Sequence, residues 1–523
     1  MARKFHSSDD TIVKTAEGLL QGFFLDDLYI FHGIKYADSL RFQPPTAPQP
    51  WEGVRSASNY GYICPVSAEP MPTAEILIPH RFWPADENCQ YLNIWTPSLD
   101  AGAKKPVMVW LHGGGFANGS SIEQVAYEGD ALAKWGDAVV VTLNHRLNIL
   151  GHLDMSSFGE KYANSVNAGI ADIVEALRWI RRNIAAFGGD PDNVMLFGQS
   201  GGGGKISALL QTPAAAGLFH RAVLMSGIFA GGHGKPVDHR PFVLEMMKEL
   251  NIPADQPEQL EKVPYVFLMR AYNKAALKIY RESKQMIDWG PVANGWYLGD
   301  PMEVGFSDFA RTVPTMAGSV IAEFGMGPSV PGAESLTPAE KRALVAKRYG
   351  EEGDKVLALF EKAYPGKDVL LLNKLDIGAR IATTQFIEEK SRVSSVPNYL
   401  YMFSLDFDVD GPRPAWHCSD IPFVFHNTAR VPCANIEGVT DQLEAAVAHA
   451  WVAFARNGKP GWTPYTDEHR ITMVFDRECR ERDNYDRELI ETLYRLTPPM
   501  SLGSMAIKRL EAAVNEQGGD WMY

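Results

Sequence analysis

The sequence predicts an α/β protein with a mostly parallel central sheet flanked by helices. Two continuous apolar runs, at 107–111 and 138–143, are typical of strands that are buried on both faces. Further along, a helical pattern at 167–187 precedes another apolar run at 194–197. A strand, a crossover helix and a second strand form the repeating unit of a parallel sheet, so these segments favour that architecture.

The helix at 167–187 has the strongest pattern in the chain. Its apolar residues recur three or four positions apart and therefore share one face: Ile170, Ile173, Leu177, Ile180 and Ile184. We expect Gly188-Gly189 to end the helix and Asp190-Pro191-Asp192 to form a turn before the strand at 194–197. The next helix is expected to begin just after Gly204.

Later segments extend the same pattern. Four apolar runs are candidate strands, at 221–225, 313–317, 399–403 and 471–475. Thr337-Pro338 has the residue types of a helix cap and first turn, and a second helical stretch at 441–456 ends at Asn457-Gly458. We find no internal repeat or low-complexity linker, so we expect a single domain over 1–523 with long insertions.

Composition excludes several classes of function. The 523 residues are 46% hydrophobic and 22% charged, which is typical of a globular protein. The net charge is −13, with 50 basic against 63 acidic residues and no basic run, so nucleic acid is not expected as a partner. No apolar run reaches the about 18 residues that a membrane span needs.

The N-terminus and the cysteines predict a reducing compartment. Residues 1–10 lack the apolar stretch of a secretory signal, which favours a cytoplasmic location. The cysteine count is odd and no pair has C-x-x-C spacing, so we expect reduced thiols and no structural zinc: Cys64, Cys89, Cys418, Cys433 and Cys479.

A serine flanked by glycines follows the strand at 194–197. The stretch Gly198-Gln199-Ser200-Gly201-Gly202 matches the G-x-S-x-G pattern, in which a sharp strand-to-helix turn exposes the serine hydroxyl. Small neighbours are needed because a Cβ at the flanking positions would collide with the turn. Alone, the pattern is equally compatible with an ordinary glycine-rich loop. In this context Ser200 is the candidate nucleophile.

A glycine loop, His112-Gly113-Gly114-Gly115-Phe116, follows the strand at 107–111. Ester hydrolysis passes through a tetrahedral intermediate with a negative oxygen, which backbone N–H groups can stabilise as an oxyanion hole. Glycines allow the backbone to approach that oxygen closely. Together with the serine turn, this loop predicts an oxyanion hole made by the N–H groups of Gly114, Gly115 and Gly201.

Six further stretches make the sequence similar to the type-B carboxylesterase and cholinesterase family. They occur in the family's order, at 31–37, 40–42, 87–95, 144–146, 187–191 and 454–458. The resemblance covers most of the chain. It implies an α/β-hydrolase fold with long loop and helical insertions, and an enzyme that hydrolyses carboxylic esters.

The resemblance also implies the remaining catalytic residues. The family's acid lies in a G-T-N-x-D-E-G stretch, which places Glu323 here, although Ala322 and Phe324 depart from that pattern. The family's histidine precedes D-[IL]-P-F-V-F, which places His417 before Asp420. A Ser-His-Glu triad would then act through an acyl-enzyme, with Ser200 as nucleophile, His417 as base and Glu323 orienting the imidazole. No cofactor or metal is expected.

Several positions depart from the family. Cys64 and Cys89 match the first disulfide of secreted relatives, so we expect the two sulfurs to be close, whether or not they are bonded. Gln199 replaces the usual glutamate, which weakens the case for a choline-like cation. Trp83 does not have the spacing of the cholinesterase tryptophan and is expected to be a packed or rim aromatic. Gly201 replaces the usual alanine and is expected to loosen the turn.

Alternatives for the function remain at this point. The favoured substrates are small-molecule esters of small to medium acids. The alternatives are a lipase, with the loop after Cys64 as a lid, and a non-catalytic adhesion or scaffold relative. Amidase, lactonase and carbamate hydrolase activities use the same machinery and also stay open, as does the oligomeric state.

Overall fold

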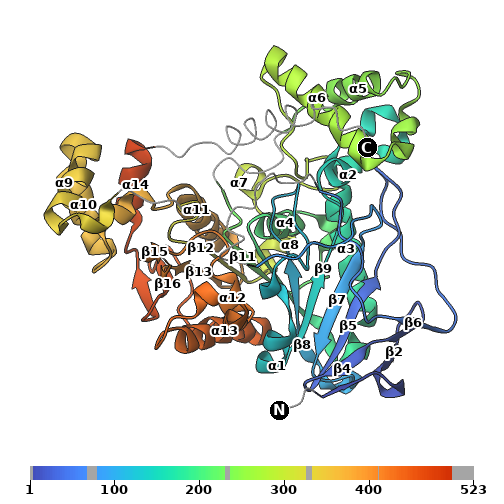
Figure 1. Ribbon diagram of the computed structural model, residues 1–523, viewed down its shortest axis with the longest axis horizontal. Coiled ribbons are helices and arrows are strands. Elements are labelled where there is room, and N and C mark those ends of the chain that lie inside the picture. The colour runs from blue at the N-terminus through green and yellow to red at the C-terminus, as the bar shows by residue number, and fades with distance from the viewer. Residues whose placement is uncertain (1–3, 67–78, 230–235, 326–331, 410, 498–523) are drawn as a thin grey trace.

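The computed structural model describes residues 4–66, 79–229, 236–325, 332–409 and 411–497. Its centre is a 12-stranded sheet in the order β1-β4-β5-β7-β9-β8-β10-β11-β12-β13-β16-β17 (Figure 1). Seven neighbouring strands are parallel: β9 (Val139–Leu143), β8 (Lys105–Leu111), β10 (Gly189–Gln199), β11 (Arg221–Met225), β12 (Thr315–Val320), β13 (Asn398–Phe403) and β16 (Ile471–Phe475).

Antiparallel strands extend both edges of this sheet. At one edge they are β1 (Phe5–His6), β4 (Phe23–Leu25), β5 (Leu28–Lys35) and β7 (Tyr91–Thr96), and at the other β17 (Arg480–Asp483). Two small sheets stand apart: β2 (Ile12–Lys14), β3 (Leu19–Gln21) and β6 (Val54–Ser56) in one, β14 (Asp406–Asp408) and β15 (Pro412–Pro414) in the other.

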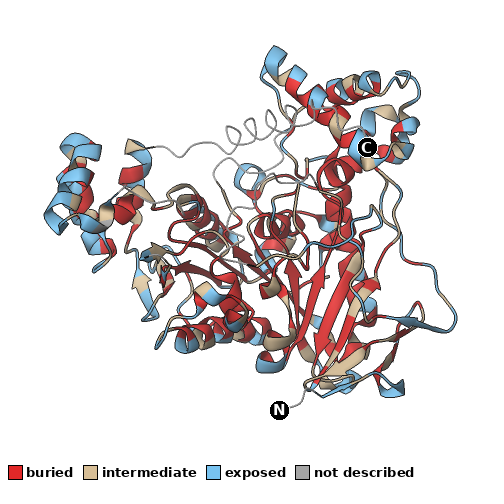
Figure 2. Cartoon of the chain, in the orientation of Figure 1, coloured by how far each residue is buried: buried red, intermediate tan, exposed pale blue. Residues whose placement is uncertain are grey.

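Helices cover both faces of the sheet, and alternate strand residues belong to two different cores. Val107 and Val109 pack with α3 and α4, whereas Met108 and Trp110 pack with α1 and α13. This alternation is expected because successive strand side chains point to opposite faces. The four helices are α1 (Asp130–Gly136), α3 (Ala168–Asn183), α4 (Gly201–Leu210) and α13 (Thr440–Asn457). Figure 2 shows the sheet buried between them.

The other helices lie mainly in insertions between the strands. Two of them, α5 and α6, pack together in a third core that includes Met246 and Leu268. The remaining helices are α2 (Asn148–His152), α5 (Arg240–Glu249), α6 (Tyr265–Ser283), α7 (Pro301–Val304), α8 (Asp308–Thr312), α9 (Pro338–Tyr349), α10 (Gly353–Ala363), α11 (Gly378–Val393), α12 (Ile421–Val424) and α14 (Arg487–Leu496). The expected α/β architecture with helical insertions is therefore confirmed.

Most predicted elements are confirmed, with shifts at three boundaries. The residues 190–192 belong to β10, where the register against β8 is irregular between Gly189 and Val194, rather than to a separate turn. Strand β12 begins after Pro314, whose ring nitrogen carries no hydrogen for the ladder. Helix α4 begins at Gly201, not after Gly204. Thr337 caps α9 as expected, by accepting a hydrogen bond from the Glu340 N–H.

A buried ion pair ties α3 to the loop after β9. The Arg146 side chain donates to Asp172 twice, with Nη2–Oδ1 at 2.7 Å and Nε–Oδ2 at 2.9 Å. The Arg146 backbone N–H adds a third bond at 3.0 Å, and both side chains are 2% exposed or less. Because neither charge reaches water, each depends on the other for its solvation.

Removing the charge of Asp172 should therefore destabilise the protein strongly. We expect Asp172→Asn to lower the free energy of unfolding by about 3–5 kcal/mol, because Arg146 keeps a buried charge without its counter-ion. The measurement is urea unfolding followed by circular dichroism. The control is Asp192→Asn, since Asp192 pairs with Arg181 at 3.4 Å in solvent and should contribute less than about 1 kcal/mol. Equal effects of the two substitutions would contradict this account.

Candidate active site

Ser200 lies on the turn that joins β10 to α4. Its φ of 55° and ψ of −125° are strained for a residue with a side chain. The turn is fixed on both sides, because the Ser200 N–H donates to the Met225 carbonyl at 2.8 Å and its own carbonyl accepts from the Gly204 N–H at 3.1 Å. The predicted strand-turn-helix context of the serine is present.

Glycine is required where α4 begins because the helix end touches other backbone segments. A Cβ on Gly202 would overlap the Leu111 carbonyl oxygen at the end of β8. A Cβ on Gly201 would lie 2.5 Å from the Gly115 nitrogen and Cα, closer than real Cβ contacts allow. The expectation that Gly201 merely loosens the turn is therefore corrected: glycine here lets the glycine loop pack directly on α4.

The glycine loop brings two N–H groups to the serine turn, which contributes a third from Gly201. Gly114 and Gly115 have φ angles of +82° and +62°, which favour glycine. Within the described parts of the chain, the N–H groups of Gly114, Gly115 and Gly201 donate to no acceptor. Such unpaired N–H groups at a helix N-terminus can bind a developing negative charge.

His417 and Glu323 are joined by two hydrogen bonds. His417 Nδ1 lies 2.6 Å from Glu323 Oε2, and the His417 backbone N–H donates to the Glu323 carbonyl at 2.7 Å. Glu323 is fully buried just after β12, and its other oxygen accepts from the Val320 N–H at 3.0 Å. The His417 side chain keeps 17% of its surface exposed. Two segments 94 residues apart in the sequence thus form one rigid pair.

Two more carboxyl groups lie near this pair. Burial, and then the charge of Glu323, raise the pKa of Asp420 to about 7. The same two causes raise the pKa of Asp376 to about 6. Asp420 is 1% exposed, and its Oδ2 lies 3.5 Å from the Tyr401 hydroxyl. Near neutral pH these neighbours bind protons more readily than ordinary aspartates.

Gln199 lies between the serine turn and the histidine. Its Nε2 is 3.3 Å from both ring nitrogens of His417, and its Oε1 accepts from the Cys418 thiol at 3.2 Å. In the portion of the chain that the structure describes, no hydrogen bond joins the Ser200 hydroxyl to His417. The structure thus brings Glu323 and His417 together and holds Ser200 one residue from the amide that contacts His417.

The sequence did not draw attention to Lys205, the fifth residue of α4. It is fully buried, and its Nζ donates to the His112 carbonyl at 2.9 Å, at the start of the glycine loop. Burial lowers the pKa of Lys205 to about 7. The sequence did offer one signal for this contact: Lys205 is the charged residue of α4 and directly follows four glycines.

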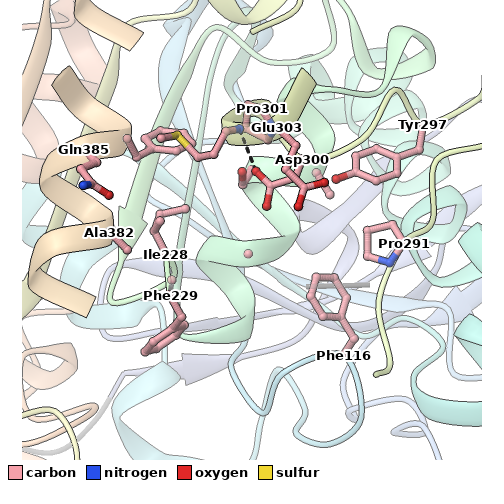
Figure 3. A pocket seen from close by; sticks show the side chains of 16 residues that line it. Phe116, Ile228, Phe229, Pro291, Tyr297, Asp300, Pro301, Glu303, Ala382 and Gln385 are labelled. Atoms are coloured by element: carbon pink, nitrogen blue, oxygen red, sulfur yellow. Dashed lines mark hydrogen bonds between the residues drawn. The ribbon is translucent and has the colours of Figure 1, made fainter. Parts of the chain in front are cut away.

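A pocket of about 170 Å³ opens beside the serine turn (Figure 3). Gly204 of α4 and Gly227 both line the pocket. Gly227 lies so near the serine turn that a Cβ on it would collide with the Ser200 carbonyl oxygen. Figure 3 shows Phe116 and Phe229 on one side and the Asp300 and Glu303 carboxylates across from them. The remaining lining residues include Ile228, Pro291, Ala382 and Phe386.

The sequence also led to predictions for two cysteines, a tryptophan and a loop around the site. The Cys64 and Cys89 thiols are free and buried, and burial and then a hydrogen bond with Cys64 raise the pKa of Cys89, so the sulfurs are close as expected. Trp83 packs edge-on against Tyr60 at 5.5 Å, as a rim aromatic would. The lid expected after Cys64 lies largely at 67–78, outside the described residues.

In the described ranges, no helix has the length and apolarity to cross a bilayer. No group of three or more metal-ligating side chains is present among those residues either.

Comparisons with known proteins agree on one family. The model of the carboxylesterase family matches residues 9–350. Para-nitrobenzyl esterase of Bacillus subtilis is 31% identical over 92% of this chain and 98% of its own length. Phenmedipham hydrolase of Pseudarthrobacter oxydans is 32% identical over 86% of this chain and 90% of its own length.

A solved structure is similar over almost the whole chain. It is described as an esterase from anaerobic Clostridium hathewayi that can hydrolyze aliphatic aromatic polyesters. Its TM-score is 0.91 and its identity 45%, over 95% of this chain and all of that one. These neighbours have the α/β-hydrolase fold, and their activity removes the non-catalytic scaffold alternative. The chain therefore belongs to the carboxylesterase family and is a serine carboxylic ester hydrolase.

Proposed function

We propose that Ser200, His417 and Glu323 form the catalytic triad of this hydrolase. The observation that carries the proposal is the 2.6 Å hydrogen bond between His417 Nδ1 and buried Glu323, next to the strained Ser200 turn. That bond leaves His417 Nε2 as the ring nitrogen available to the serine. A carboxylate on Nδ1 fixes the required tautomer and stabilises the imidazolium that forms during attack.

The reaction then follows from these positions. His417 accepts the Ser200 proton as the hydroxyl attacks the ester carbonyl, and it returns the proton to the leaving alcohol. Water repeats the cycle on the acyl-enzyme. For attack, Ser200 Oγ must come within reach of His417 Nε2, and catalytic hydrogen bonds commonly tighten in this way when substrate binds.

The developing oxyanion has three candidate donors. We assign the N–H groups of Gly114, Gly115 and Gly201, because they have no acceptor in the described chain and their backbones meet at the start of α4. Preorganised donors of this kind typically contribute about 10²–10³-fold each to kcat. Lys205 stabilises the start of the glycine loop by donating a hydrogen bond to the His112 carbonyl.

Glu323, rather than Asp420, is assigned as the acid. Glu323 bonds Nδ1 directly, whereas the side chain of Asp420 contacts the Tyr401 hydroxyl. Burial, and then the charge of Glu323, raise the pKa of both buried neighbours. Of these three carboxyl groups, Glu323 is the one that bonds the imidazole.

The proposed substrates are esters of small to medium acids. The pocket beside Ser200 is about 170 Å³ in volume and is lined largely by apolar groups, including Phe116, Ile228 and Phe386. Its charged lining residues are Asp300 and Glu303, and further polar groups come from Ser207, Tyr297 and Gln385. A pocket of this size suits a short or medium acyl group better than a long chain.

A second candidate activity is cleavage of ester bonds in a polymer. The relative from Clostridium hathewayi is described as hydrolysing aliphatic aromatic polyesters and shares 45% of its residues with this chain. In addition, Phe324, next to Glu323 in the sequence, is 56% exposed, which suits a substrate that approaches from solvent.

Substituting the nucleophile gives the first test. We expect Ser200→Ala to lower kcat/KM for p-nitrophenyl acetate by about four decades or more, because no hydroxyl remains to be acylated. Ser156→Ala, at an exposed position, is the control and should stay within about twofold of the parent. If the Ser200 variant keeps more than about a hundredth of the activity, the assignment of the nucleophile is wrong.

The Asp420 proton gives a test through pH. Its pKa of about 7 in the folded state lies above the usual 3.8, so its stabilising contribution is complete below about pH 4 and is lost as pH rises through 7. We expect Asp420→Asn to abolish this loss. Relative to the parent, the variant should gain about 3 kcal/mol in free energy of unfolding between pH 5 and pH 8.

Urea unfolding at both pH values measures this difference. Asp255→Asn, at an exposed position, is the control and should shift the free energy equally at pH 5 and pH 8. The same flat result for Asp420→Asn would mean that the Asp420 carboxyl does not hold its proton near neutral pH.

Polymer hydrolysis can be tested separately. Incubation with a copolyester of aliphatic and aromatic diacids should release both diacids, measured by liquid chromatography, and Ser200→Ala should release neither. Release no greater than with the Ser200→Ala protein would remove polyester cleavage as an activity and leave the small-ester assignment intact.

A further inference from the structure

Phe324 exposes a phenyl ring at the edge of the active site. Its side chain is 56% exposed, although phenylalanine is among the residues most often buried in folded proteins. The ring centroid lies 4.9 Å from that of His417, with an interplanar angle of 33°. In the family pattern that this stretch resembles, a glycine follows the acid, so the ring is an addition at this position.

Phe229 continues the aromatic surface toward the pocket. Its ring lies 6.1 Å from Phe324 and 6.3 Å from His417, so the three rings form a compact triangle. Phe229 also lines the pocket beside the serine turn, and Phe116 lies on the same side of that pocket (Figure 3). One aromatic surface therefore runs from solvent at Phe324 into the pocket at Phe229.

The chemistry of this surface favours a flat aromatic partner. Aromatic rings attract one another in offset-stacked or edge-to-face arrangements with centroids about 4.5–7 Å apart. One side of the Phe324 ring packs against His417. The exposed side can pack in the same way against an aromatic ring of a ligand. A carboxylate beside the nucleophile, which would favour a cation, is replaced by Gln199, whose amide is neutral.

We propose that Phe324 and Phe229 form an aryl subsite, which binds an aromatic ring carried by the ester substrate. The proposal rests on the proposed triad, because it places the ring beside the histidine that acts on the scissile bond. The ring can belong to the acid or to the alcohol of the ester, and the subsite recognises the same chemistry in both. Phe324 and Phe229 are thus specificity-determining residues.

Matched esters test the subsite, because any difference in intrinsic reactivity within a pair is the same for the parent and for every variant. One pair is benzyl acetate and cyclohexylmethyl acetate, which differ in whether the alcohol ring is aromatic. The other pair is ethyl phenylacetate and ethyl cyclohexylacetate, which differ in the acid ring. The readout is the ratio of kcat/KM within each pair, so a general change in catalysis cancels.

We expect the parent enzyme to prefer the aromatic member of at least one pair. Phe324→Leu and Phe229→Leu should each reduce that preference about three- to tenfold, which is the range that one lost ring pair supports. Phe267→Leu is the matched control, because Phe267 is 52% exposed on α6, and its ratios should equal those of the parent. Thermal unfolding of each variant checks that it is folded.

Unchanged ratios in both pairs would overturn the aryl subsite, and so would equal losses for aromatic and cyclohexyl esters. Ser200→Ala assayed on the same esters keeps the two proposals separate. An inactive Ser200 variant with unchanged ratios in the phenylalanine variants would remove the subsite alone. An active Ser200 variant would instead remove the triad.

Discussion

The site depends on close backbone contact at the start of α4. Gly202 lies against the end of β8 and Gly201 against Gly115, and neither contact leaves room for a Cβ. This packing forces Ser200 into its strained turn and, in the same place, gathers the N–H groups of the glycine loop at a helix N-terminus. In the proposed mechanism, the placement of the Ser200 hydroxyl and the stabilisation of the oxyanion are therefore two consequences of one contact, where the sequence has four successive glycines.

The second constraint on the site is the burial of Glu323 behind His417. Glu323 is removed from water, and its oxygens are satisfied by His417 and by the Val320 N–H. This arrangement suits its proposed role of orienting the imidazole. Burial, and then the charge of Glu323, raise the pKa of Asp376 and Asp420, so both bind a proton more readily than ordinary aspartates. Glu323 differs from these neighbours because it hydrogen-bonds His417 Nδ1 directly.

The sequence predicted the sheet and the strand-turn-helix context of Ser200 well, because their signals are local. Continuous apolar runs marked β8, β9 and β10, and the glycine patterns marked two turns. It missed what depends on contacts between distant segments. From the sequence, Gly201 was expected only to loosen the turn, because its contact with Gly115 is visible only in the fold. In the same way, the sequence does not show that Lys205 donates to the His112 carbonyl. The place of Gln199 between the serine turn and His417, 218 residues further on, was equally inaccessible.

The most direct test is a crystal structure of the enzyme after reaction with a fluorophosphonate, which mimics the tetrahedral intermediate. The account predicts phosphorus bonded to Ser200 Oγ and a phosphonyl oxygen within hydrogen-bonding distance of the N–H groups of Gly114, Gly115 and Gly201. His417 should face the adduct through Nε2 and still hold Glu323 through Nδ1. Phosphorus on another residue, or a phosphonyl oxygen directed away from the glycine loop, would contradict it.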